Sequence, residues 1–179
     1  MKRAKIIDLK KYLKGKSEKE LIDEIVELFK TNKQVQEIYS IKLNPQNEEI
    51  LLEEYKDKVI QQFFPSRGMN VLNYNVLKKL ISDFEKVAIK KSNVIELLLC
   101  YAENGVDFTN SYGDIDEQFY NNISKIYEKA LYLIAENNLE EKYLEDCQNI
   151  MNDATGIGWG FGDWMDELFY DYFGDFIKE

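Results

Sequence analysis

Apolar residues recur every three or four positions along almost the whole chain, and this helical periodicity constrains the fold more than any other feature of the sequence. Alternation with a period of two, which is typical of half-buried strands, is nearly absent. Breaks at Gly15, at 44–47 and at Pro65 separate the periodic segments. The sequence therefore predicts an all-α chain of about eight or nine antiparallel stacked helices, as a helical bundle or a short array of helix hairpins.

Start and stop signals indicate where the individual helices begin and end. Ser17 and Glu20 have the spacing of a capping box, in which each residue satisfies a free backbone N–H of the other. Ser92 is predicted to begin a helix that ends at Gly105, and Asp114 to cap the following one. The other predicted helices cover about 6–14, 33–42, 48–64, 70–90, 139–154 and 164–173, and a further one starts at Ser17 and carries the apolar residues Leu21, Ile25, Leu28 and Phe29.

The length of 179 residues is enough for one domain with a core, so we expect a single domain over residues 1–179. No apolar run reaches the roughly 18 residues that a membrane helix needs, and the basic start lacks the apolar stretch of a signal peptide. We therefore expect a cytoplasmic protein. Cys100 and Cys147 lie in helical patterns without a CxxC motif, and are expected to be buried free thiols.

The chain contains no histidine, which excludes Ser-His and Cys-His catalysis and the commonest zinc ligand. Carboxylate and tyrosine chemistry remains open. A carboxylate–metal hydrolase is one alternative, in which the loops around residues 112–117 and 158–166 meet and share a metal ion. The ligands would then be Asp114, Asp116, Asp163 and Asp166. The preferred prediction is that the protein is not an enzyme and uses no cofactor or metal.

Charge is distributed unevenly along the chain. Residues 1–16 carry seven Lys or Arg against Asp8, a balance of +6, whereas residues 136–179 carry twelve Asp or Glu against two Lys, a balance of −10. The whole chain also has a net charge of −10, which repels nucleic-acid phosphates and disfavours direct nucleic-acid binding. An acidic C-terminal region could instead attract a basic partner.

Four glycines alternate with other residues in the stretch TGIGWGFGDW. No register of this stretch gives the G-x-G-x-x-G spacing of a dinucleotide site, and no GK[ST] follows that would indicate a phosphate-binding loop. We expect Gly156 to end one helix and Asp163 to cap the next. Ile157, Trp159 and Phe161 would then point to the same side of a backbone that packs against a neighbour.

The last predicted helix has one apolar and aromatic face and one acidic face. Buried tryptophan and tyrosine side chains often dominate protein interfaces. The candidate partner-binding residues are therefore the aromatic and acidic ones of the two loops: Trp159, Phe161, Trp164, Asp163, Asp166, Asp114 and Asp116.

Three stretches of the chain, LKKYLKGKSEKELIDEIVELF at 9–29, YGDIDEQFY at 112–120 and GWGFGDWMDELFYDY at 158–172, resemble an uncharacterised bacterial family of small helical cytoplasmic proteins that is known only as a domain of unknown function. The resemblance implies a helical fold and no particular activity. We therefore expect a protein–protein interaction module with an acidic and aromatic C-terminal surface and an unknown partner. A second alternative is an acidic decoy that inhibits a nucleic-acid-binding protein.

Overall fold

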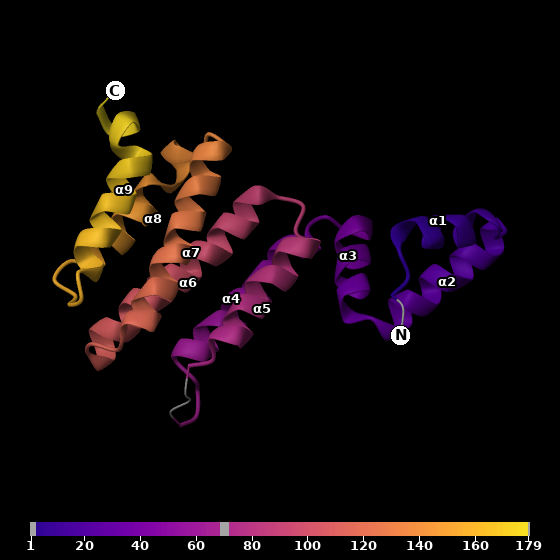
Figure 1. Ribbon diagram of the computed structural model, residues 1–179, viewed down its shortest axis with the longest axis horizontal. Coiled ribbons are helices and arrows are strands. Elements are labelled where there is room, and N and C mark those ends of the chain that lie inside the picture. Colours follow the sequence, from indigo (N-terminus) through magenta and orange to yellow (C-terminus); the bar gives the residue numbers. More distant parts are fainter. Residues whose placement is uncertain (1–2, 69–71, 179) are drawn as a thin grey trace. The chain divides into compact units, whose positions relative to one another are not determined.

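The computed structural model describes residues 3–68 and 72–178, and within them it contains nine helices and no strand (Figure 1). The predicted all-α class is confirmed. The chain divides into two compact units, Met1–Pro45 and Gln46–Glu179.

The first unit contains α1 (Ile6–Lys14), α2 (Glu18–Thr31) and α3 (Lys33–Leu43), shown in indigo and purple in Figure 1. The predicted capping box begins α2: the Ser17 hydroxyl accepts the Glu20 backbone N–H at 3.4 Å, and the Glu20 carboxylate accepts the Ser17 N–H at 2.8 Å. This reciprocal pair fixes the turn between α1 and α2.

The first unit has few buried side chains. Its buried residues within the described chain are Glu37 and Ile41, both on α3. Phe29 on α2 makes an edge-on ring contact with Tyr39 on α3, with 6.4 Å between the ring centroids. Neither α1 nor α2 has a buried residue, so this helix pair leaves its apolar side chains at the surface.

The second unit contains most of the core. Its helices are α4 (Asn47–Phe63), α5 (Tyr74–Val87), α6 (Lys91–Tyr112), α7 (Glu117–Glu136), α8 (Glu140–Asp153) and α9 (Phe161–Lys178). Helix α6 packs against α4, α5, α7 and α8, and α9 packs against α7 and α8. The predicted start of α5 near Asn70 lies outside the described residues, and the helix begins at Tyr74.

Helix α6 is longer than the sequence predicted. Gly105 does not end it: the helix continues to Tyr112, and Gly105 is buried in its interior. A Cβ atom at this position would lie 2.3 Å from the Cδ1 atom of Ile123 on α7. The glycine is therefore explained by the close approach of two helices rather than by a chain turn. Ser92 lies inside the first turn, so it is not the N-cap, which is Lys90.

The start of α6 is held by a side chain from another helix. Glu48 on α4 is 1% exposed, and its Oε1 atom accepts the backbone N–H groups of Ile89 at 3.0 Å and Lys90 at 2.8 Å. These N–H groups precede the first turn of α6, and Lys90 itself makes no side-chain cap. A carboxylate that is 41 residues away thus takes the place of a local cap.

We expect Glu48→Gln to lower the free energy of unfolding by about 1 kcal/mol, because an amide oxygen accepts the two N–H groups without the added strength of a charge. Urea denaturation measures the loss. The matched control is Glu49→Gln, which removes an exposed ion pair with Lys90 and should change stability much less. Equal losses for the two variants would contradict the capping role.

Candidate functional site

The α6–α7 loop and the α8–α9 loop meet in the second unit. Asp114 lies so close to Gly158 that a Cβ atom on the glycine would be 2.8 Å from Asp114 Oδ2. The rings of Tyr120 and Phe161 are in contact, with 4.8 Å between their centroids. The sequence left open whether these two acidic and aromatic stretches are neighbours, and the structure brings them together.

The hydroxyl of Tyr120 organises the α6–α7 loop. It donates to Asp114 Oδ1 at 3.0 Å, accepts the backbone N–H of Ile115 at 3.3 Å and lies 2.9 Å from the hydroxyl oxygen of Thr109. Thr109 in turn donates to the carbonyl oxygen of Gly113 at 3.1 Å. These bonds fix the carboxylate of Asp114 where it meets the glycine-rich loop.

Two structural requirements account for the glycine string. Gly156 and Gly160 have φ angles of +82° and +69°, in the left-handed region that favours glycine. Gly158 and Gly162 lie at close approaches: Gly158 meets the α6–α7 loop, and a Cβ atom on Gly162 would be 2.7 Å from the carbonyl oxygen of Ala154. The string therefore forms a tight turn between α8 and α9.

Trp159 is the exposed side chain of this turn. Its backbone has φ +61°, which is uncommon for a bulky residue and costs free energy, yet 66% of its surface is exposed. Phe161, two residues later, is 1% exposed. The prediction that Ile157, Trp159 and Phe161 point the same way is therefore wrong, because left-handed residues at 159 and 160 interrupt the alternation of side chains.

The remaining candidate contact residues of this segment all lie on α9. Trp164 is half-buried on α9. Asp163 is not the N-cap of α9, because that helix already begins at Phe161 and places Asp163 in its first turn. Asp166 follows on the same helix and is exposed.

The cap of α7 also differs from the prediction. Asp114 does not cap this helix. Asp116 does, through an Oδ1 atom that accepts the Phe119 N–H at 2.7 Å. The Tyr120 hydroxyl holds Asp114 instead, which places the start of α7 two residues later than predicted.

Two aspartates of the α6–α7 loop and two on α9 are exposed, and we call these four the acidic rim: Asp114, Asp116, Asp163 and Asp166. None of the ion pairs in the described part of the chain includes any of them. Asp116 caps α7 and Asp163 lies in the first turn of α9, where the helix N-terminus stabilises negative charge without neutralising it. The rim therefore presents carboxylates without an ion-pair partner, and one of them, Asp114, lies against Gly158, next to Trp159 in the chain.

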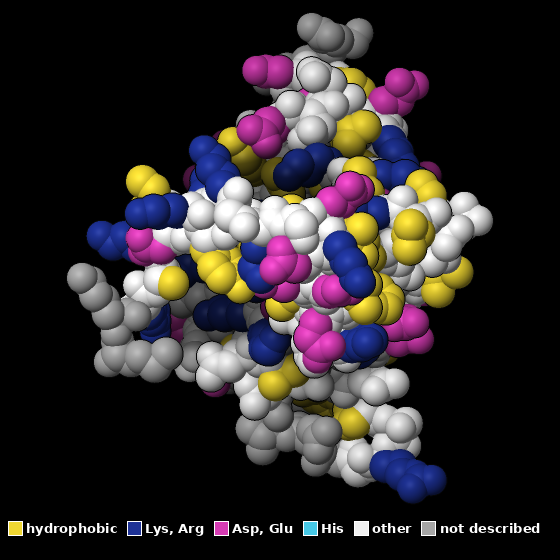
Figure 2. Space-filling view, turned by 90° about the vertical axis from the view of Figure 1, so that its right-hand side faces the viewer, with side chains coloured by type: hydrophobic (Ala, Val, Ile, Leu, Met, Phe, Trp, Pro, Cys, Tyr) yellow, Lys and Arg dark blue, Asp and Glu magenta, His cyan; other side chains and the backbone are white. Residues whose placement is uncertain are grey.

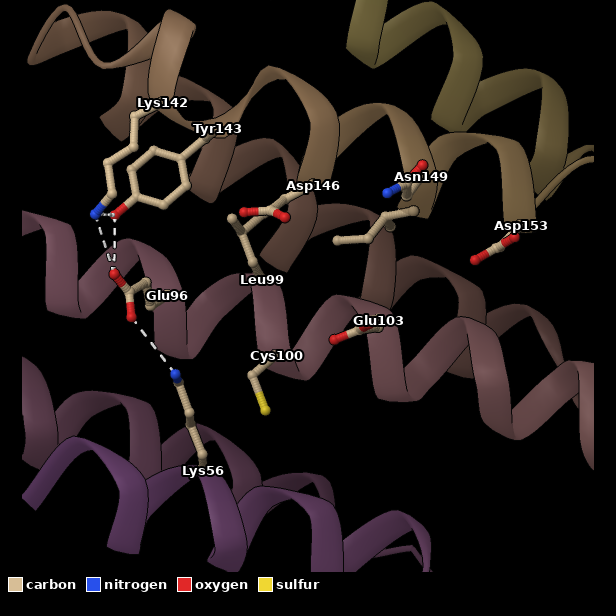
Figure 3. A pocket seen from close by; sticks show the side chains of 11 residues that line it. Lys56, Glu96, Leu99, Cys100, Glu103, Lys142, Tyr143, Asp146, Asn149 and Asp153 are labelled. Carbon is tan, nitrogen blue, oxygen red and sulfur yellow. Dashed lines mark hydrogen bonds and ion pairs between the residues drawn. The ribbon is translucent and has the colours of Figure 1, made fainter. Parts of the chain in front are cut away.

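A groove of about 350 Å³ lies on α6 between α4 and α8 (Figure 3). Its polar lining divides into two ends. At one end Glu96 bridges Lys142 at 3.2 Å and Lys56 at 3.5 Å, and Tyr143 donates to the same carboxylate at 3.3 Å. One carboxylate is therefore paired with two ammonium groups at this end.

The other end of the groove is acidic. Glu103, Asp146 and Asp153 line it, and Asp107 follows Glu103 on the next turn of α6. Burial, followed by repulsion from the three aspartates, raises the pKa of Glu103. Burial and Asp153 likewise raise the pKa of Asp107. No ion pair in the described chain neutralises these four carboxylates.

Sequence reasoning missed this groove. Glu96, Glu103 and Asp107 are seven and four residues apart, and Asp146 and Asp153 are seven apart, which places each set on one helix face. That periodicity was available from the sequence. It does not show that the two faces point at one another, because this depends on how α6 and α8 pack.

We expect Glu103→Gln to raise the free energy of unfolding at neutral pH by a few tenths of a kcal/mol, since the group is partly exposed and its repulsion is screened. A carboxyl whose pKa is raised in the fold destabilises the protein above that pKa, and this cost disappears as the pH falls through the raised pKa to the unfolded value. Thermal unfolding between about pH 4 and pH 7 should show the two proteins converging at the acidic end. A constant difference would contradict the electrostatic cause.

The described residues contain no group of three or more Cys, Asp or Glu side chains that could hold a metal ion. Within the same residues, no helix is long and apolar enough to cross a membrane.

A family model described as a family of unknown function, DUF6155, matches residues 4–173. No curated protein and no solved structure matches the chain. The likeness of the three sequence stretches to an uncharacterised family of helical proteins is confirmed by this match and by the helical fold.

Proposed function

The chain belongs to the DUF6155 family, whose function is unknown, and we propose that it is a protein-interaction module that binds a basic partner. The binding surface consists of Trp159 and the acidic rim. Phe161, a predicted contact residue, supports this surface from below, because it is buried against Tyr120. Trp164 is half-buried beside it.

The main support for the proposal is that Trp159 is exposed although its backbone is in the left-handed region. The Trp159 side chain is 66% exposed, so its burial contributes little to the free energy of folding, and the left-handed backbone of this residue lowers the stability of the fold. Solvent-exposed aromatic anchors of this kind are the residues that dominate binding energy when a partner buries them. The turn that holds the ring is itself fixed by Asp114 and Tyr120, which reduces the ordering cost on binding.

Charge supports a basic partner. The acidic end of the groove lies beside the loops, because the Asn110 side chain at the end of α6 donates to the Asp153 carbonyl oxygen at 2.9 Å. The rim and the acidic end of the groove thus add negative charge around the same part of the unit. A partner with Lys or Arg side chains and an apolar pocket for Trp159 matches both features.

Affinity capture with three forms of the full-length protein tests the proposal. Trp159→Ala should weaken capture of a specific partner by about 30-fold, the effect of losing an interface anchor worth about 2 kcal/mol. Tyr132→Ala, which removes another aromatic ring that is 51% exposed, is the matched control and should retain the partner. Identical partner sets for wild type and Trp159→Ala would count against this surface.

The acidic end of the groove favours a second candidate, in which the protein is an acidic decoy that occupies the basic groove of a nucleic-acid-binding protein. Carboxylates that lack a paired cation provide the negative potential that such mimicry needs. Inhibition should then weaken strongly between about 0.05 M and 0.5 M salt, as the screening length falls. Inhibition that salt leaves unchanged would remove this candidate.

A further inference from the structure

The α1–α2 pair has an apolar face that its own unit leaves exposed. We call this the hairpin face, and it consists of Ile6, Leu9 and Tyr12 on α1 and Ile22, Ile25, Val26 and Phe29 on α2, which are 40–75% exposed and lie at helical spacing. Figure 2 shows a face of the molecule on which hydrophobic side chains reach the surface between Lys or Arg and Asp or Glu side chains. Short helices depend on burial of such a face for most of their stability, so a covering surface is required.

Polar side chains hold α1 and α2 together as a fixed hairpin. The Tyr12 hydroxyl donates to Glu24 Oε1 at 2.8 Å, and the Lys16 ammonium lies 2.6 Å from the same oxygen. Lys16 also lies over the Tyr12 ring, 4.7 Å from its centroid. The hairpin therefore offers its two helices to a partner in one defined arrangement.

The two helices carry opposite charge. Between Ser17 and Thr31 there are five Asp or Glu and two Lys, a balance of −3, against the basic balance of residues 1–16. Charged side chains that make no ion pair in the described chain include Lys10, Lys11 and Lys14 on α1 and Glu18, Asp23 and Glu27 on α2. Helix α1 thus carries lysines without an ion pair, and α2 carries carboxylates without one.

We propose that two copies of the chain associate through the hairpin face, with α1 of each copy lying along α2 of the other. A two-fold axis repeats every contact, so the cations of α1 meet the anions of α2 twice, and both apolar faces are buried in a bundle of four helices. The charge pattern selects a second copy as the occupant. A uniformly basic or acidic partner matches one helix and repels the other.

Sedimentation equilibrium of the full-length protein tests the association. The wild type should be a dimer, and Ile25→Asp, at a position that is 42% exposed, should raise the dimer dissociation constant by about 100-fold. The matched control is Ile50→Asp on α4, at a position that is 61% exposed, which should remain dimeric. Circular dichroism checks that both variants stay helical. A monomeric wild type, or an Ile25→Asp protein that dimerises normally, would overturn the inference.

Charge reversal tests the pairing of α1 with α2. Lys10→Glu with Lys14→Glu should weaken the dimer by roughly tenfold, and adding Asp23→Lys with Glu27→Lys should restore it. Failure to restore would overturn this pairing. Trp159→Ala should leave the dimer intact, which separates this inference from the proposed partner surface. Loss of the dimer in that variant would place self-association at Trp159 and overturn the hairpin contact.

Discussion

Phe161→Ala is expected to lower the free energy of unfolding by about 3–5 kcal/mol, the usual cost of removing a buried aromatic ring from a core. Phe161 is 1% exposed and packs on the ring of Tyr120, so its loss leaves a cavity between α7 and the start of α9. Chemical denaturation followed by circular dichroism measures the change.

Trp159→Ala is the matched control, since it removes a larger ring only two residues earlier in the chain. Trp159 is 66% exposed, so its loss should change stability by no more than about 0.5 kcal/mol. The pair of variants thus separates the two aromatic roles of the glycine-rich loop, one in folding and one in binding. Similar destabilisation by both would show that Trp159 also packs in the fold.

Gly105→Ala is expected to lower the free energy of unfolding by about 1–3 kcal/mol, although alanine is the better helix former. The added Cβ atom would lie 2.3 Å from Ile123 Cδ1 and 2.8 Å from Ile123 Cγ1, and Ile123 is fully buried. Either α6 and α7 move apart or the isoleucine leaves its preferred rotamer. Thermal denaturation checks the loss.

Gly174→Ala is the control for Gly105→Ala. Gly174 lies inside α9, and a Cβ atom added there would have no neighbouring atom within 4 Å, so alanine should stabilise the helix by up to about 1 kcal/mol. Ile123→Val, which deletes the nearest atom, should recover part of the loss at Gly105. A loss of stability for Gly105→Ala with a gain for Gly174→Ala would confirm the contact between α6 and α7 as the cause. A gain of stability for both variants would contradict it.

The helical class and most helix positions were predictable, because apolar periodicity and caps are local signals. The Ser17–Glu20 capping box is an example, since the whole signal lies within four residues. The predicted break at Gly105 failed for a physical reason: a glycine that ends a helix and a glycine that admits a neighbouring helix look the same in sequence. Only the position of Ile123 distinguishes them.

The geometry of the candidate site was not predictable from the sequence. Trp159, Phe161 and Asp114 were candidate contact residues from the sequence, which left open whether their two stretches meet, and the structure shows that they do. It did not show that Phe161 points inward and Trp159 outward, because the left-handed backbone at Trp159 follows from tertiary contacts of the turn. The same limit hid the groove, whose two acidic faces come from α6 and α8, two helices that are not consecutive in the chain.

The reactivity of the two cysteine thiols can be used to measure local unfolding of the protein. Both are free and buried, and burial raises the pKa of Cys100 to about 11 and that of Cys147 further still. A thiol reagent at neutral pH therefore reacts with Cys147 only when α8 detaches from its neighbours. The rate of that reaction would follow the dynamics of this helix without any label, and would reveal whether a bound partner slows it.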